Sequence, residues 1–239
     1  MKILGLIPAR GGSKSVLQKN IKLLAGKPLI AYTIEEAKKS NLINRIIVSS
    51  DDKEIVKISK KFGAEAPFLR PSHISQDDTP DLPVFQHVLK WLKKNENYIP
   101  DIIIHLRPTS PLRKVEHINS GIKLLLKNKS ADSVRSICEP NQTPYKMWKI
   151  IKGYLAPLLN IKSNKKVETY NLPRQKLPKV YWQTASVDVI RYDTIMKKNS
   201  MTGDKILPLY IDEKYSIDLD TELDFKIAEE IIKSGVING

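Results

Sequence analysis

Residues 2–14 read KILGLIPARGGSK, a short apolar run that passes directly into a loop rich in glycine and positive charge. The apolar run predicts a buried strand over Lys2–Ile7. In the loop, two adjacent glycines let backbone N–H groups approach an anion closely, and Arg10, Lys14 and the nearby Lys19 add three positive charges. The spacing matches neither a Walker motif nor a dinucleotide-binding fingerprint. This density of cations after a buried strand suits a triphosphate.

Outside this segment, strand and helix patterns alternate along the chain. Strands are predicted at Arg45–Ser49, Glu65–Leu69, Asp101–Leu106, Ser133–Cys138, Trp182–Arg191 and Ile206–Ile211, and helices at Leu29–Ser40, Lys53–Phe62, Leu82–Lys94, Val115–Leu126 and from Thr221 to Gly235. The alternation predicts an α/β fold with a Rossmann-like, mostly parallel sheet and helices on both faces. Active sites in such sheets lie at the carboxyl ends of the strands.

The pattern breaks over residues 139–181, where five prolines occur and the helical period is lost. We interpret this stretch as an irregular or β-rich excursion within a single domain of residues 1–239, and not as a separate domain.

Composition narrows the function classes. The 239 residues carry 40 Lys and Arg against 26 Asp and Glu, a net charge of +14, which favours anionic partners. The lysines fall in pairs near helix ends, without a basic block or interleaved aromatic residues, so a nucleic-acid partner is not expected. No apolar run has the length of a membrane span, and the single Cys138 excludes an internal disulfide, which makes a reducing cytoplasm the expected compartment.

Two further motifs carry chemistry. Residues 106–113 read LRPTSPLR and follow a predicted strand, so that two prolines stiffen a turn that offers hydroxyls and arginines. Residues 215–221 read YSIDLDT, and in an extended segment Asp218 and Asp220 point to the same side. Paired carboxylates in a strongly basic protein suit Mg²⁺, whose coordination substrate phosphates complete. Asp220 is alternatively a cap of the last helix. The four histidines show no metal-ligand spacing and receive no role.

Taken together, these motifs resemble the acylneuraminate cytidylyltransferases, the CMP-sialic acid synthetase family, over nearly the whole chain. The resemblance rests on residues 7–14 (IPARGGSK) with 19–21 (KNI), 47–51 (IVSSD), 107–113 (RPTSPLR), 173–175 (PRQ) and 217–224 (IDLDTELD). It implies a nucleotide-diphospho-sugar transferase type of fold, a requirement for Mg²⁺ and a homodimer formed largely through the excursion. The implied reaction is attack of the anomeric hydroxyl of a nine-carbon 2-keto sugar acid on the α-phosphorus of CTP, which releases pyrophosphate.

The resemblance also implies residue roles. Catalytic roles fall to Arg10, Lys19, Asp218 and Asp220, of which the two aspartates would hold the metal. The nucleotide would contact Ala9, Arg10, Gly11, Lys14, Lys19, Asn20, Arg70, Asp78, Thr79, Arg107, Pro108 and Thr109. The sugar would contact Lys146, Arg174, Thr184 and Asp188.

Three positions depart from the family pattern. Sialic-acid members usually have Gln where Arg107 stands, Asn where Thr184 stands and Tyr where Asp188 stands. The residues expected at the nucleotide therefore mostly follow the family pattern, whereas those expected at the acceptor sugar do not. Legionaminic, pseudaminic or another nonulosonic acid fits as well as N-acetylneuraminate.

Three alternatives stay open at this point. A 3-deoxy-manno-octulosonate cytidylyltransferase resembles the chain at the first loop but typically carries YGSTRLPGK there. A sugar-phosphate nucleotidyltransferase of the same fold would show a Gly-x-Gly-x-Arg loop, which is absent from the sequence. A non-catalytic basic binding module would need no acidic pair.

Overall fold

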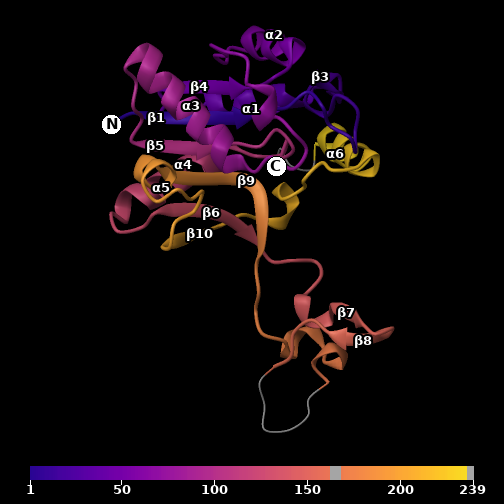
Figure 1. Ribbon diagram of the computed structural model, residues 1–239. Coiled ribbons are helices and arrows are strands. Elements are labelled where there is room, and N and C mark those ends of the chain that lie inside the picture. The colour runs from indigo at the N-terminus through magenta and orange to yellow at the C-terminus, as the bar shows by residue number, and fades with distance from the viewer. Residues whose placement is uncertain (162–167, 236–239) are drawn as a thin grey trace. The chain divides into compact units, whose positions relative to one another are not determined.

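A six-stranded sheet forms the core of the larger of two compact units in the computed structural model, which describes residues 1–161 and 168–235 (Figure 1). Its strands follow the order β10-β6-β9-β5-β1-β4. β1 runs parallel to both β4 and β5, and β10 runs parallel to β6, whereas β9 is antiparallel to β5. The bounds are β1 Ile3–Pro8, β4 Arg45–Ser49, β5 Ile102–His105, β6 Ser133–Cys138, β9 Trp182–Arg191 and β10 Ile206–Tyr210.

Helices cover both faces of this sheet, as the alternation of patterns predicts. One apolar cluster joins Ile3 and Ile7 of β1 to α1 (Leu29–Lys38), α2 (Lys53–Lys61) and α4 (Val115–Lys127). A second joins Leu4 and Leu6 of the same strand to α3 (Asp81–Glu96) and α5 (Tyr192–Met196). Alternate side chains of a strand point to opposite faces, so a continuous apolar run is buried on both sides. The predicted fold class is confirmed.

One local expectation is wrong, and one helix was missed. Glu65–Leu69 does not form a strand, since among the described residues only an isolated bridge between Ile47 and Glu65 is present there. α5 was not predicted, because five residues are too few to show a helical period.

A third apolar cluster connects the first loop to the end of the chain. It contains Val16, Leu24, Leu29, Leu219, Phe225 and Ala228. Leu24 lies in a small hairpin of β2 (Leu23–Leu24) and β3 (Lys27–Pro28), which follows a 3-10 turn at Lys19–Ile21. Phe225 lies in α6 (Glu222–Ser234). Because Leu219 is buried between Asp218 and Asp220, this cluster fixes both aspartates close to the first loop.

α6 begins and ends as its sequence predicts. The side chain of Thr221 accepts from the backbone N–H of Asp224, and the carboxylate of Asp224 accepts from the N–H of Thr221, which together form a capping box. Gly235 ends the helix with φ 70°, a left-handed conformation that favours glycine.

Residues 138–182 form a compact unit of their own, and its limits lie within one residue of the predicted excursion. The unit contains an antiparallel hairpin of β7 (Trp148–Ile151) and β8 (Tyr154–Pro157) and short 3-10 turns at Pro144–Lys146, Thr169–Asn171 and Arg174–Lys176. Across the two described ranges of the chain, none of the helices is long and apolar enough to cross a membrane.

Candidate active site

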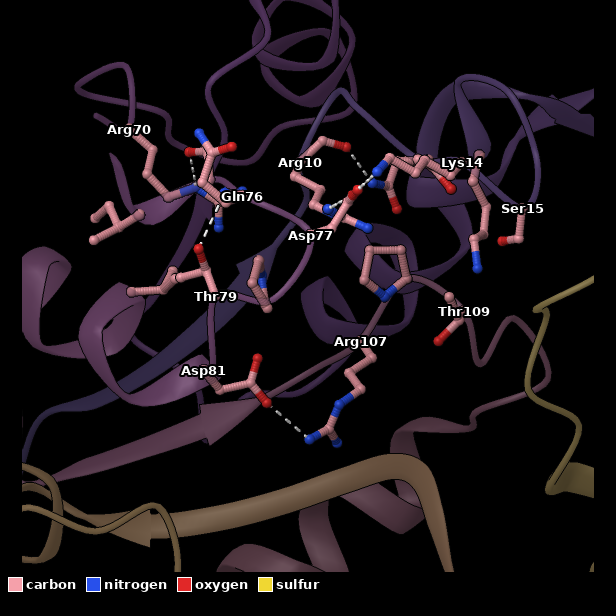
Figure 2. Close-up of a pocket in the computed structure, with 18 of the residues that line it drawn as sticks. Arg10, Lys14, Ser15, Arg70, Gln76, Asp77, Thr79, Asp81, Arg107 and Thr109 are labelled. Carbon is pink, nitrogen blue, oxygen red and sulfur yellow. Dashed lines mark hydrogen bonds and ion pairs between the residues drawn. The ribbon is translucent and has the colours of Figure 1, made fainter. Parts of the chain in front are cut away.

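A cavity of about 540 Å³ lies at the carboxyl ends of β1 and β5. β4 follows β1 on one side and β5 lies on the other, so the chain changes direction across the sheet at this point, which is where open α/β sheets bind their ligands. All lining residues belong to residues 8–109 and to Asp220. Figure 2 shows cationic side chains at one end of the cavity and the pair of Asp81 and Arg107 at the other.

The cationic end is built from the first loop. Arg10 and Lys14 both form ion pairs with Asp77, which lies in the loop before α3. The amide of Asn20 donates to the backbone carbonyl of Arg10 at 2.9 Å, so it holds the loop in place from within. Both cations lower the pKa of the Asp77 carboxyl by hydrogen bonding. In this arrangement a carboxylate occupies the position where a phosphate oxygen would satisfy both cations.

In the same loop, the backbone of Gly11 lies close to the carboxylates of Asp51 and Asp52. The N–H of Gly11 donates to Asp51 Oδ1 at 3.1 Å, and the buried guanidinium of Arg70 lies 3.5 Å from the same oxygen. A Cβ on Gly11 would lie 2.7 Å from the carboxylate of Asp52, so no larger residue fits here without a shift. Burial lowers the pKa of Arg70.

The carboxyl-terminal aspartates meet the first loop through Lys19. Its ammonium donates to Asp220 Oδ1 at 3.0 Å and to the carbonyl of Leu219 at 2.9 Å. The N–H of Leu219 in turn donates to the carbonyl of Thr109 at 2.9 Å, in the LRPTSPLR loop. The three sequence motifs therefore converge at one edge of the sheet.

Asp218 is the aspartate with a perturbed pKa. The residue keeps an exposed outer surface, yet the atoms packed around its carboxylate desolvate it and raise its pKa, and the charge of Asp220 acts in the same direction. A hydrogen bond with Thr109 acts in the opposite direction. A carboxylate that is costly to ionise beside a second carboxylate is stabilised by a cation, so this pair fits a divalent ion.

The described residues contain no group of three or more His, Cys, Asp or Glu placed to hold a metal. Mg²⁺ does not need such a group, because it usually binds one or two protein carboxylates and takes its remaining ligands from substrate phosphates and water.

The remaining predicted residues fall into four groups. Thr79, Pro108 and Thr109 line the cavity. Ala9 is buried and bonds to Ser49 through its backbone N–H, and Asp78 is exposed next to the lining segment. Thr184 is 1% exposed, and its hydroxyl donates to Ser136 inside the sheet at 2.7 Å. Lys146 and Arg174 belong to the second compact unit, where Arg174 donates to the carbonyl of Pro140.

At the other end of the cavity, sequence reasoning named Arg107 and Asp188 but missed their pairing and the residues Asp81, His105 and Arg135 around them. Arg107, the arginine that departs from the family pattern, forms ion pairs with Asp81 at 3.2 Å and with Asp188 at 3.3 Å. Asp188 is the second departure, and it also binds Arg135 at 3.0 Å. Two of the three departures therefore contact each other, and the departures themselves were the signal that could have suggested a pair.

A buried arginine supports this end from behind. Arg113 is 1% exposed and donates to the carbonyls of Ser186 and Arg107 and to the hydroxyl of Thr33. Burial lowers its pKa to about 9, and the nearby charge of Arg107 adds to this effect. Its contacts fix the backbone of the LRPTSPLR loop against β9.

The sequence of this protein matches a model of a known family over most of its length. The family model described as Cytidylyltransferase matches residues 4–176. The chain belongs to the cytidylyltransferase family. This family assignment confirms that the protein is a nucleotidyltransferase enzyme.

Relatives in this cytidylyltransferase family are close over the full length. The flagellin modification protein B of Campylobacter coli is 32% identical over 97% of this chain and 95% of its own length. The CMP-N,N'-diacetyllegionaminic acid synthase of Campylobacter jejuni is 32% identical, with the same coverage of both chains. The expected membership of the acylneuraminate cytidylyltransferases is thereby confirmed.

A solved structure shows the same fold. The CMP:2-keto-3-deoxy-manno-octonic acid synthetase complexed with CTP superimposes with a TM-score of 0.69 over 98% of this cytidylyltransferase and 99% of that chain, at 14% identity.

Proposed function

We propose that this cytidylyltransferase transfers CMP from CTP to the anomeric hydroxyl of a nonulosonic 2-keto sugar acid and releases pyrophosphate. The observation that carries the proposal is the convergence of Arg10, Lys14 and Lys19 with Asp218 and Asp220 at one edge of the sheet. The full-length match to a legionaminic acid synthase supports a nonulosonic acid as acceptor.

Charge neutralisation is the main task of such a site. A triphosphate carries roughly four negative charges and a sugar acid carries one, so the two substrates repel each other and catalysis depends on positioning and electrostatic stabilisation. Arg10 and Lys14 would bind the phosphates after leaving Asp77, and Lys19 would hold its place beside Asp220. The oxygen of the acceptor hydroxyl forms a bond to the α-phosphorus and gives its proton to the carboxylate of Asp218 or Asp220. The bond from that phosphorus to the bridging oxygen breaks as pyrophosphate leaves.

Asp218 and Asp220 would hold Mg²⁺ in this reaction. Bound there with the phosphates, the ion supplies charge neutralisation at the transferred group. The raised pKa of Asp218 supports this role, because a cation removes the electrostatic cost of two neighbouring carboxylates.

The experiment that tests the proposal is pyrophosphate release from CTP and Mg²⁺ with a panel of sugar acids. The panel contains N,N'-diacetyllegionaminate, pseudaminate, N-acetylneuraminate and 3-deoxy-manno-octulosonate. We expect turnover with at least one nine-carbon acid and at least tenfold lower kcat/KM for the eight-carbon acid. A preference for 3-deoxy-manno-octulosonate, or no release with any acceptor, would contradict the proposal.

We also propose that the protein is a homodimer that associates through the second unit. The cross-strand pair of Ile150 and Leu155 leaves these side chains 78% and 65% exposed, and Tyr154 is 79% exposed. Such a cluster of exposed apolar side chains is typical of an interaction surface.

The dimer is tested by light scattering during size-exclusion chromatography. We expect the wild type at twice the chain mass and the double variant Ile150→Glu/Leu155→Glu at the mass of one chain. Ile99→Glu is the matched control, because Ile99 is an exposed apolar residue in the loop before β5 and should leave the mass unchanged. A wild type with the mass of one chain would overturn this proposal and leave the proposed reaction standing.

A further inference from the structure

The end of the cavity away from the cationic loop is a wall of polar side chains, which we name the β5–β9 wall: Asp81, His105, Arg107 and Asp188, with Arg135 behind them. Asp81, His105 and Arg107 line the cavity. The two carboxylates make this wall unsuitable for a triphosphate, which has the cations of the first loop at the opposite end. If the proposed function holds and the cytidine lies toward Arg70 and Thr79, two other lining residues, the wall faces the other substrate, the acceptor. Arg107, which the resemblance to the family gives to the nucleotide, then serves the acceptor instead.

Sheet pairing assembles the wall from distant segments. β5 and β9 are antiparallel, and their register places His105 directly opposite Asp188. Residues directly opposite in neighbouring strands share a face of the sheet. β6, which carries Arg135, is the next strand beyond β9, and Asp81 is the first residue of α3, which covers this face.

Ion pairs hold Arg107 in one position. Asp188 is 2% exposed and accepts from Arg107 through Oδ2 at 3.3 Å, while Arg135 binds both of its oxygens at 3.0 and 3.2 Å. The other terminal nitrogen of Arg107 donates to Asp81 at 3.2 Å. Two arginines and two carboxylates balance in charge, so the wall requires no charged ligand, and the buried Asp188 has its partners within the protein.

His105 is the group of the wall whose hydrogen bonds are unmade. Its side chain is 1% exposed, and neither ring nitrogen has a hydrogen-bond partner; Nδ1 lies 3.8 Å from Asp81 and 4.0 Å from Asp188. Burial and the three nearby arginines lower its pKa well below the ordinary value, so the ring is neutral. A neutral imidazole offers one donor and one acceptor, and a buried polar group left without partners is destabilising.

We propose that the β5–β9 wall binds a hydroxyl group of the acceptor through His105, Asp81 and Arg107, and that Asp188 and Arg135 are positioning residues that hold Arg107 for this contact. A hydroxyl group both donates and accepts hydrogen bonds. The three side chains match this, because Asp81 accepts, Arg107 donates, and His105 can do either. A carboxylate on the ligand would meet two carboxylates here, and an ammonium group would meet Arg107.

The first test replaces the imidazole and measures acceptor discrimination. Single-deoxy analogues of the acceptor that the wild type turns over fastest are compared with the parent sugar. A site that hydrogen-bonds a hydroxyl rejects the analogue that lacks it, so we expect one analogue to lose at least tenfold in kcat/KM with the wild type. In His105→Leu, kcat/KM for the parent sugar should fall by a similar factor, so that the variant no longer distinguishes the parent sugar from that analogue. KM for CTP should stay within twofold of the wild-type value.

Stability separates this role from a structural one. Because Leu removes unsatisfied polar atoms, His105→Leu should melt at the same temperature as the wild type or higher, whereas a structurally required histidine would lower the melting temperature. His105→Gln, whose amide both donates and accepts, should recover part of the lost acceptor activity.

The second test is a double-mutant cycle between the two departures from the family pattern. Arg107→Gln and Asp188→Asn should each lower kcat/KM for the acceptor at least fivefold. The loss of kcat/KM in the double variant should be at least fivefold smaller than the product of the two single losses, because either substitution already breaks the ion pair between the two residues. Arg45→Gln is the matched control: Arg45 also bridges two carboxylates, Glu65 and Glu96, but it begins β4 at the opposite edge of the sheet, so the acceptor parameters should stay unchanged.

The outcomes separate this proposal from the proposed function. Wild-type turnover with an unchanged acceptor KM and kcat in His105→Leu, or a rise in KM for CTP alone, would overturn the role of the wall. Independent, multiplicative effects of Arg107→Gln and Asp188→Asn would overturn the positioning role. No turnover of any acceptor by the wild type would overturn the proposed function and this inference together.

Discussion

Asp218→Asn is expected to lower kcat about 10³-fold while the fold stays intact, a loss of the size seen when one preorganised electrostatic contact is removed from an active site. The amide keeps the shape of the side chain and an oxygen that accepts a hydrogen bond from Thr109, but it removes the charge that would bind the metal. Pyrophosphate release at saturating CTP, acceptor and Mg²⁺ measures the effect.

The same variant has a stability signature whose sign follows from the pKa. A carboxyl with a pKa above its unfolded value of 3.8 favours folding below that pH and loses this contribution as pH rises through the folded value. Asp218→Asn should therefore melt at the same temperature as the wild type near pH 3.5 and at an equal or higher temperature near pH 7. Thermal unfolding across this range measures the difference.

Asp212→Asn is the matched control for Asp218→Asn. Asp212 is exposed in the same carboxyl-terminal segment and caps the 3-10 turn Glu213–Tyr215 through the N–H of Lys214. Its replacement should change kcat by less than twofold. Wild-type kcat in Asp218→Asn, or an equal loss in Asp212→Asn, would remove the metal-binding role from Asp218.

Arg10→Ala is expected to weaken CTP binding about 10²-fold, because it removes a charge-assisted contact to the phosphates from a partly enclosed loop. Titration calorimetry with CTP and Mg²⁺ measures the dissociation constant directly and does not depend on the acceptor. The binding of the acceptor in the absence of nucleotide should be unchanged.

Asp77→Asn should have the opposite effect on CTP binding. Asp77 pairs with both Arg10 and Lys14, so a triphosphate must displace its carboxylate before it binds them. Neutralising Asp77 should tighten CTP binding severalfold, and the gain should shrink at high salt, which screens exposed charges. Unchanged affinity in Arg10→Ala, or weaker binding in Asp77→Asn, would contradict the phosphate-binding role of the loop.

The local pattern of the sequence was enough for most of the fold. Ser133–Cys138 and Trp182–Arg191 match the structure residue for residue, and the capping box and Gly235 mark the last helix, because strand and helix periods and caps are properties of neighbouring residues. The convergence of the motifs after strands β1 and β5 also follows from sequence, since the carboxyl ends of parallel strands meet at one edge.

Only the tertiary structure brought the residues of the β5–β9 wall together. His105 received no role from the sequence because it stands in an apolar strand without ligand spacing, and neither Arg135 nor Asp81 belongs to a motif. Their placement in one wall arises from the antiparallel register of β9 on β5 and from the packing of α3. Whether a buried group has a hydrogen-bond partner depends on all the atoms that surround it in the folded protein. The imidazole of His105 could therefore be recognised as unpartnered only in the tertiary structure.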